Sequence, residues 1–190
     1  MARGRWRPAV AAGLSAVLLA AGCGAEDGPE PTPSSPLADC SGVVAVGRPD
    51  PRRPLPRLTL SCLAGGAPVA LDQVRGPAVI NLWASWCQPC RQELPVLQGL
   101  ADRAAGRLQV VGVVVSDRRA AATALAEELG VTFPALEDPD DLVRPQLGAA
   151  GVPATAFVDA DGNLRHVHNL PLDEAELARL VEEHLEVTVG

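Results

Sequence analysis

The sequence contains no Lys and no Tyr, and aromatic residues make up only 3% of its 190 residues. All 16 basic residues are therefore Arg. The hydrophobic fraction is still 47%, so a core has to be built mainly from Val, Leu, Ile and Ala. A chain of this length suits one domain of ordinary size plus some additional sequence.

Positive charge is also scarce. Arg3, Arg5 and Arg7 lie in the first 22 residues, which hold no acidic residue, and the remainder has 13 Arg against 23 Asp and Glu, a formal charge of −10. A domain this acidic is a poor partner for nucleic acid or for an anionic membrane surface. We expect no nucleic-acid partner, and the acidity is otherwise explained by solubility.

Long apolar runs are missing as well. The run at 10–21 has about a dozen residues, whereas a membrane-spanning helix needs about 20. It follows three Arg and precedes small residues, which is typical of a secretory signal. Residues 19–23, LAAGC, resemble a bacterial lipobox. The resemblance implies cleavage before Cys23, acylation of its sulfur and a lipid anchor at the extracytoplasmic face of the bacterial cell membrane. The alternative is an ordinary secreted protein with a leftover Cys.

The segment after Cys23 is rich in Pro, Gly, Ser and acidic residues, a composition that cannot bury enough apolar surface to fold. Extended, residues 24–39 would reach roughly 50 Å from the anchor. We therefore predict a lipoprotein signal peptide at 1–22, a lipid anchor and Pro-rich tether at 23–39, and a folded domain at 40–190.

Five Cys are present, and an exported protein keeps them in an oxidising compartment. Cys23 is assigned to the lipid, and Cys87 and Cys90 to redox chemistry. Cys40 and Cys62 remain, and we predict that they form a structural disulfide, which the chain-entropy model values at about 3 kcal/mol. The alternative is a second redox pair that passes electrons to Cys87 and Cys90.

Apolar periodicity and turn residues predict alternating strands and helices, which indicates a layered α/β domain. Near-continuous apolar runs predict buried strands, and Gly65-Gly66 predicts a hairpin turn. Asp72 is expected to cap a short helical turn. Asp173 with Glu176 predicts a capping box at the last helix. The predicted strands are 58–62, 68–71, 78–84, 108–115, 132–136, 154–159 and 164–167, and the predicted helices are 88–105, 118–129, 140–148 and one from 173 onward.

The motif at 87–90, CQPC, begins a helix directly after a buried strand. Zinc needs a second Cys or His pair at metal spacing, which is missing. Covalent haem needs His after Cys90, where Arg91 stands, and a peroxidase needs Thr three residues before Cys87, where Ala84 stands. Dithiol redox chemistry fits this context best.

The chemistry follows from the helix. Cys87 lies at the helix N-terminus, where free N–H groups and the macrodipole favour an anion, so its thiolate is expected to be stabilised. Cys90 is on the same side, is expected to be more buried, and resolves the mixed disulfide. Pro89 stiffens the turn, and Trp86 is expected to shield one side of the sulfurs.

Residues 81–95, NLWASWCQPCRQELP, closely resemble the TlpA/ResA-like thioredoxin-fold oxidoreductases, and 151–155, GVPAT, is similar to their cis-proline loop. The resemblance covers roughly 56–188. It implies a thioredoxin-like α/β fold with an N-terminal β-hairpin extension and a central insertion near 118–136.

The resemblance also implies roles for single residues. Pro153 should be cis, and Val152 should offer backbone groups to a bound polypeptide. Glu93 should lie near the dithiol and tune proton transfer at Cys90, unless it is only an exposed helix charge. Asn81 stands where thioredoxin itself has a buried Asp, so Glu93 or water must handle more of the proton transfer.

Three His leave a different class of function open. His166 and His168 are expected on one face of a strand, and His184 lies on the last helix. Copper binding would make the protein a metallochaperone, and a redox-silent binding lipoprotein is a related alternative. Metal-delivery proteins of related fold use a different Cys spacing, so we assign no metal site and no cofactor.

The leading prediction is a monomeric enzyme that reduces disulfides in exported proteins, apocytochrome c among the candidates, with electrons from a membrane-embedded thiol-relay donor. The reverse direction, an oxidant that inserts disulfides, uses the same residues, because one scaffold spans about −270 to −120 mV. The catalytic prediction is Cys87, Cys90, Glu93 and Pro153, with Trp86 and Val152 contacting the client.

Overall fold

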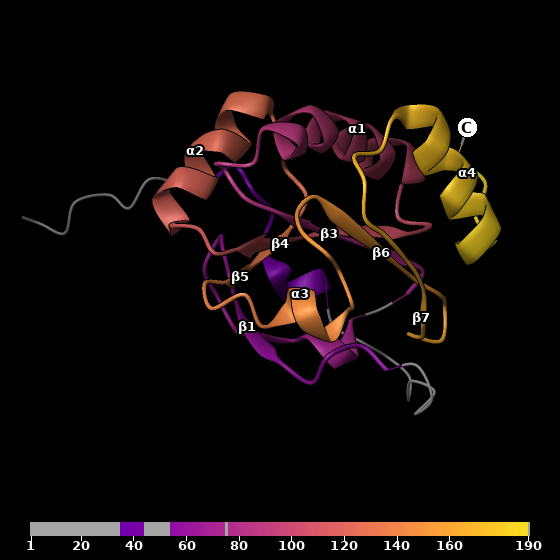
Figure 1. Ribbon diagram of the computed structural model, residues 1–190, viewed down its shortest axis with the longest axis horizontal. Helices are drawn as coiled ribbons and strands as arrows, with labels where there is room; N and C mark the ends of the chain where they lie inside the picture. Colours follow the sequence, from indigo (N-terminus) through magenta and orange to yellow (C-terminus); the bar gives the residue numbers. More distant parts are fainter. Residues whose placement is uncertain (1–34, 44–53, 75, 190) are drawn as a thin grey trace, which may run out of the picture. The chain divides into compact units, whose positions relative to one another are not determined.

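A mixed sheet forms the centre of the protein, with the strand order β2-β1-β5-β4-β3-β6-β7 (Figure 1). The computed structural model describes residues 35–43, 54–74 and 76–189. The strands are β1 (Thr59–Cys62), β2 (Val69–Ala70), β3 (Ala78–Trp83), β4 (Gln109–Val115), β5 (Ala135–Asp138), β6 (Ala154–Val158) and β7 (Leu164–His168). The domain is thioredoxin-like, as expected from the sequence.

The central strand β3 determines the geometry of the site. It runs parallel to β4 and antiparallel to β6, and all six of its residues are buried. Strands covered on both faces need apolar side chains on both sides, which explains the unbroken run at 78–84. The β1–β2 hairpin extends the sheet through an antiparallel pairing of β1 with β5.

Helices cover both faces of the sheet. In Figure 1, α1, α2 and α4 lie above the sheet and α3 lies below it. The helices are α1 (Gln88–Ala104), α2 (Arg119–Leu129), α3 (Val143–Gln146) and α4 (Glu174–Leu185), with short 3-10 turns η1 (Cys40–Gly42) and η2 (Leu71–Gln73). No helix within the described ranges is long and apolar enough to cross a bilayer.

Alternation along β3 divides the core in two. Val79 and Trp83 pack under α1, α2 and α4, together with Phe157 of β6. Ile80 and Leu82 point to the other face, where the hairpin and α3 cover them. Both cores are largely aliphatic, as the composition requires.

Three local details differ from the sequence-based expectations. The strand expected at 132–136 is shifted to Ala135–Asp138, because Pro134 has no N–H to donate and precedes the paired segment. Asp72 lies inside η2, whose N-cap is Ala70, so it does not cap that turn. In α4, Asp173 accepts the Glu176 N–H at 2.8 Å, while the Glu176 carboxylate bonds Arg179 instead of reaching back.

The packed structure begins before Cys40. Leu37 is buried in the core under α1, and the Ala38 N–H donates to Thr132 O at 2.8 Å. Packing thus extends into the end of the segment 23–39, which the composition assigns to a tether. The signal peptide, Cys23 and most of that segment lie outside the described residues.

A disulfide joins Cys40 to Cys62, with an S–S distance of 2.03 Å. Both Cys are buried, at 3% and 2% exposure, and they join η1 to β1 within the aliphatic core. Arg119 holds the same region by donating to Leu63 O at 2.5 Å and pairing with Glu137. This arrangement favours the structural role over the second redox pair.

We expect the Cys40→Ala, Cys62→Ala double variant to lose about 3 kcal/mol of unfolding free energy, because the bridge closes a loop of sequence separation 22. Urea denaturation under oxidising conditions measures the loss. Disulfide reduction by the folded variant should match that of the wild type. A variant that stays folded but no longer exchanges electrons would contradict the structural assignment.

Candidate active site

The dithiol lies where β3 gives way to α1. Cys87 is the N-cap of α1, and its sulfur accepts the Cys90 N–H at 3.2 Å. The two sulfurs are joined at 2.04 Å, so the structure describes the oxidised form. Cys87 is 4% exposed and Cys90 is fully buried, which makes Cys87 the sulfur that a client can reach first.

The helix end explains why a reduced Cys87 would be reactive. The sulfur lies at the first turn of a 17-residue helix, where N–H groups without intrahelical partners point outward. One of them, from Cys90, already contacts the sulfur. These donors and the macrodipole stabilise a thiolate, which is the nucleophile in thiol–disulfide exchange.

Glu93 is fully enclosed, at 1% exposure, although it carries a carboxyl group. It accepts a hydrogen bond from Asn81 Nδ2 at 2.9 Å and one from the Leu172 N–H at 3.2 Å, and Thr155 Oγ1 lies 3.4 Å away. Burial raises the pKa of Glu93 from 4.5 to about 7, although the three hydrogen bonds oppose the rise. The alternative of an exposed helix charge is therefore wrong.

Cys90 and Glu93 are three residues apart on the buried side of α1. Side chains at this spacing are neighbours on a helix, with Cβ atoms about 5–6 Å apart. A carboxyl group with a pKa of about 7 exchanges its proton readily at neutral pH. The spacing and the pKa are those of a candidate proton-transfer group for Cys90.

Asn81 connects Glu93 to the sheet. Its Nδ2 donates both to Glu93 and to Thr155 Oγ1, at 3.0 Å for the latter, while its Oδ1 is buried without a hydrogen-bond partner. Asn81 and Thr155 are directly opposite each other in the β3–β6 pairing. An unpartnered buried acceptor is costly. If the amide of Asn81 flips, its Oδ1 can accept a hydrogen bond from a protonated Glu93.

Two hydrogen-bond partners of Glu93 were not predicted from the sequence. Thr155 follows Pro153 by two residues, and only the strand register shows that it faces Asn81. Leu172 contributes a backbone N–H from the β7–α4 loop, for which no side-chain pattern exists. Had the predicted strand 154–159 been paired with the predicted strand 78–84, Thr155 would have been a candidate neighbour of Asn81.

The Val152–Pro153 peptide bond is cis, in the geometry expected from the sequence. Because β6 is antiparallel to β3, its first residues lie at the end of β3 from which the dithiol turn departs. Pro153 is buried and Val152 is half-buried. The Ala150 N–H also bonds Asn169 Oδ1 at 2.8 Å, which ties this loop to the loop that supplies Leu172.

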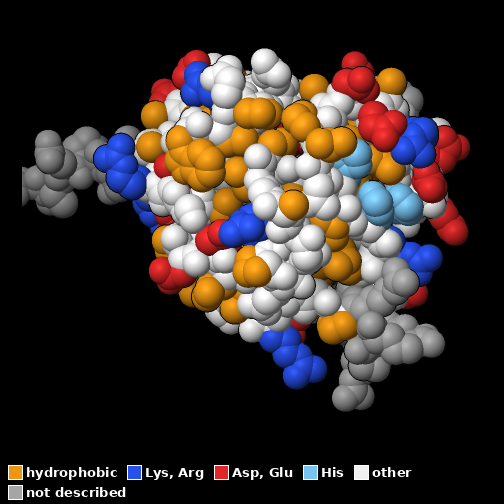
Figure 2. All heavy atoms as spheres, viewed as in Figure 1, with side chains coloured by type: hydrophobic (Ala, Val, Ile, Leu, Met, Phe, Trp, Pro, Cys, Tyr) orange, Lys and Arg blue, Asp and Glu red, His pale blue; other side chains and the backbone are white. Residues whose placement is uncertain are grey.

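Trp86 is mostly exposed, at 62%, and its indole N–H donates to Ser116 O at 3.0 Å. The ring is thus fixed against the β4–α2 loop and presents a large apolar face to solvent. Figure 2 shows hydrophobic side chains distributed over this view of the protein, with acidic groups near its edges. An exposed aromatic beside a reactive sulfur is suited to contact with a polypeptide.

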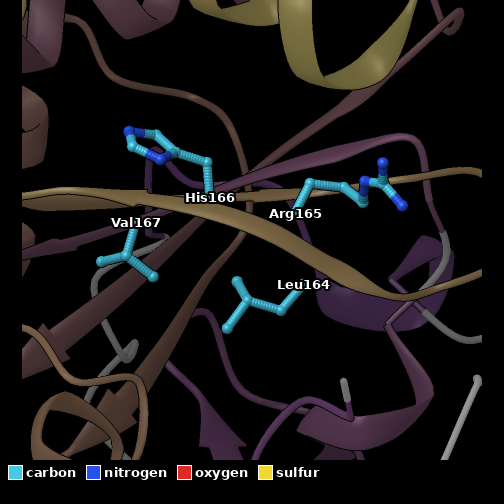
Figure 3. A pocket seen from close by; sticks show the side chains of 4 residues that line it. All are labelled: Leu164, Arg165, His166 and Val167. Carbon is cyan, nitrogen blue, oxygen red and sulfur yellow. The ribbon is translucent and has the colours of Figure 1, made fainter. Parts of the chain in front are cut away.

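The three His occur together on β7 and α4. His166 of β7 stacks on His184 of α4 with ring centroids 4.5 Å apart, and His168 lies 6.2 Å from His166. A shallow pocket of about 370 Å³ lies along β7, and Figure 3 shows His166 on the opposite side of the strand from Val167 and Leu164. Among the described residues no group of three or more His, Cys, Asp or Glu is arranged to hold a metal. His166 and His184 pack against each other and against Phe157 between β7 and α4.

Comparison with known proteins agrees with this site. Residues 51–167 match the AhpC/TSA family. The thiol:disulfide interchange protein DsbE homolog of Paracoccus denitrificans is 37% identical over 123 residues, which cover 63% of this chain and 66% of that protein. The thiol-disulfide oxidoreductase ResA of Geobacillus kaustophilus is 28% identical over 119 residues, covering 61% and 66%. The chain thus spans about two thirds of the length of these relatives.

Solved structures agree as well. A secreted Mycobacterium tuberculosis disulfide oxidoreductase, described as homologous to Escherichia coli DsbE, superposes with a TM-score of 0.60 at 26% identity. The superposition covers 67% of this chain and 96% of that one. The likeness therefore extends over almost the whole of a secreted relative.

Glu93→Gln is expected to change how stability depends on pH. The folded-state pKa of Glu93 is raised, so the folded protein binds more protons than the unfolded chain between pH 4.5 and 7. The wild type should therefore lose about 3 kcal/mol of unfolding free energy, relative to Glu93→Gln, between pH 4.5 and pH 8. Urea denaturation at several pH values measures the difference.

The control is Glu127→Gln, which alters an exposed carboxylate of α2. It should follow the wild-type pH dependence. Equal pH dependence for the wild type and Glu93→Gln would show that the Glu93 carboxyl titrates normally.

Proposed function

This chain belongs to the AhpC/TSA family and is a thiol–disulfide oxidoreductase of the DsbE and ResA type, and we propose that it reduces disulfides in exported proteins. The reductive direction rests on the CQPC motif and on the resemblance of 81–95 to the TlpA/ResA-like proteins. The observation that carries the exchange chemistry is Glu93, a buried carboxyl group with a pKa of about 7, one helical turn beyond the buried Cys90. Apocytochrome c is one class of client that a reductant of exported proteins could act on.

The exchange begins with a Cys87 thiolate. It attacks one sulfur of a client disulfide, a Cys87–client bond forms, and the client's other sulfur leaves as a thiolate and takes up a proton. Cys90 then loses its proton and attacks the Cys87 sulfur. The second client thiol is released, the client has gained two electrons, and the enzyme holds the Cys87–Cys90 disulfide seen in the structure.

Glu93 serves the second step. Burial disfavours the charged form of a thiol, so Cys90 needs a nearby base at the moment it attacks. Glu93 lies on the same buried side of the helix and can accept that proton at neutral pH. Its hydrogen bonds from Asn81 and Leu172 stabilise the carboxylate before the transfer.

The client would dock against the loop at Pro153. The cis peptide bond is next to the start of β6, and a half-buried Val152 can present backbone groups to an extended polypeptide. Trp86 offers an apolar surface on another side of the dithiol turn. Backbone recognition of this kind tolerates many sequences, which suits an enzyme with several clients.

We further propose that the folded domain works while anchored outside the cytoplasm through Cys23, as a monomer without a bound cofactor. A membrane-embedded donor of the thiol-relay type would return the disulfide to the dithiol. The secreted Mycobacterium tuberculosis relative and the signal-like sequence at 1–22 support the location.

The Cys90→Ser variant should capture clients as mixed disulfides, because Cys87 can attack but nothing resolves the product. Cys87→Ser should capture none and should abolish insulin reduction. Gel analysis of exported proteins under non-reducing conditions detects the adducts. Equal capture by both variants would show that Cys87 is not the attacking sulfur.

The direction is tested by equilibration of the Cys87–Cys90 pair with glutathione. We expect a reduction potential below about −200 mV, closer to a reductant of the thioredoxin type than to the oxidant DsbA. A value near −150 mV would support the alternative, an oxidant that inserts disulfides, with the same residues in use.

The Cys23→Ala variant tests the anchor. It should move the protein from the membrane fraction to the soluble extracytoplasmic fraction and should remove metabolic labelling by a fatty acid, because one sulfur is the proposed acylation site. Retention in the membrane without label would mean that another element holds the protein there. Cys40→Ala, Cys62→Ala, which leaves Cys23 in place, is the control.

A further inference from the structure

The β4–α2 loop forms hydrogen bonds with the segment just before the dithiol. Asp117 Oδ2 accepts the Ser85 N–H at 2.5 Å, and Asp117 Oδ1 accepts the Ser85 hydroxyl at 3.1 Å. The neighbouring Ser116 O accepts the indole N–H of Trp86 at 3.0 Å. Both residues that precede Cys87 are therefore held by one loop from the adjacent strand.

This loop is itself fixed to the next strand. Ser116 adopts a left-handed backbone conformation, with φ of 49°, and its N–H donates to Asp138 O at 3.1 Å. The buried Asp138 carboxylate in turn accepts the N–H groups of Leu142 and Val143 at 2.9 and 2.8 Å. A non-glycine residue at positive φ persists where its surroundings hold it, so the loop is a rigid support for the dithiol turn.

Asp117 also brings a negative charge to this position. Its donors are neutral groups, the Ser85 N–H and hydroxyl and the Arg118 N–H at 2.7 Å. None of the ion pairs within the described part of the chain includes Asp117. The carboxylate is thus held by neutral donors, and it bonds a residue only two positions before Cys87.

We propose that Asp117 is a positioning residue for the exchange reaction, with two effects on Cys87. Its hydrogen bonds set the path by which 85–87 enters α1. Its carboxylate opposes the stabilisation of a Cys87 thiolate by the helix end, and so keeps the dithiol more reducing than the helix alone would make it. The proposal rests on the role of Cys87 as the attacking sulfur.

The physical argument concerns which redox form is stabilised. A dithiol becomes more oxidising when its reduced form is stabilised, and a favoured thiolate is the usual way to stabilise it. A nearby carboxylate repels that thiolate. For a carboxylate about 6 Å from a thiolate under water-like screening, the repulsion would correspond to about a threefold change in the ionisation equilibrium.

Asp117→Asn tests the charge while it conserves the shape. The Asn carbonyl can still accept the Ser85 N–H, and its amide can donate to the Ser85 hydroxyl. The rate of Cys87 alkylation against pH is measured in a Cys90→Ser background. We expect the midpoint of ionisation to fall, with a change in the thiolate equilibrium of about threefold or more. In the two-Cys Asp117→Asn protein at pH 8, a more stable thiolate should shift the equilibrium with glutathione towards the reduced Cys87–Cys90 dithiol.

Two further variants separate charge from support. Ser85→Ala removes the hydroxyl bond but keeps the carboxylate, so the Cys87 ionisation midpoint should remain at its wild-type value. Asp102→Asn makes the same chemical change on the exposed face of α1, 12 residues after Cys90 and about 18 Å along the helix, and should leave the midpoint unchanged. Thermal unfolding of each variant confirms that it is folded.

An Asp117→Asn midpoint equal to that of Asp102→Asn would overturn the proposal. So would a shift of the same size in Ser85→Ala, because the effect would then come from hydrogen-bond geometry and not from charge. These outcomes are independent of the direction of catalysis. A wild type that fails to reduce insulin would contradict the proposed reductase, while the effect of Asp117 on Cys87 ionisation would still be measurable.

Discussion

The proton transfer that we propose for this protein depends on a carboxyl group held inside its core. Glu93 is enclosed between α1 and the sheet, where burial disfavours its charge and hydrogen bonds from Asn81 and Leu172 partly restore it. The balance places its pKa at about 7. If the carboxyl group were more exposed it would stay ionised at neutral pH, and without its donors it would hold its proton more tightly. Either change would move the pKa of Glu93 away from neutral pH, where it is best suited to exchange a proton with a thiol.

That balance requires three distant parts of the chain to meet. Asn81 comes from β3, Thr155 from the strand paired with it, and Leu172 from the loop before α4. The β3–β6 register places Asn81 opposite Thr155, and α1 lies over both with Glu93 facing inward. The fold thus does more than display a CxxC motif at a helix end, because it also encloses the carboxyl group to which we assign proton transfer.

The sequence predicted most elements because their signals are local and strong. The run at 78–84 is apolar throughout, as a strand buried on both faces must be, and CQPC directly after it predicts the start of α1. The shifted fifth strand and the uncapped η2 are failures at short elements, where Pro134 and a tight turn outweigh side-chain preference. The burial of Glu93 could not be read from a helical position alone, and the Leu172 N–H is a backbone group that no residue pattern specifies.

The same reasoning explains why a CxxC motif identifies the fold better than the direction of electron flow. In any protein with this motif, the helix end favours a thiolate at the first Cys, which is Cys87 here. What varies is the surroundings: here a carboxylate from the β4–α2 loop bonds Ser85 just before Cys87, and a second carboxyl group lies one turn beyond Cys90. In our proposals, the first acts on the charge of the attacking sulfur and the second on the proton of the resolving sulfur. Since both groups come from outside the four-residue motif, the redox behaviour of the dithiol belongs to the packed domain and not to the motif itself.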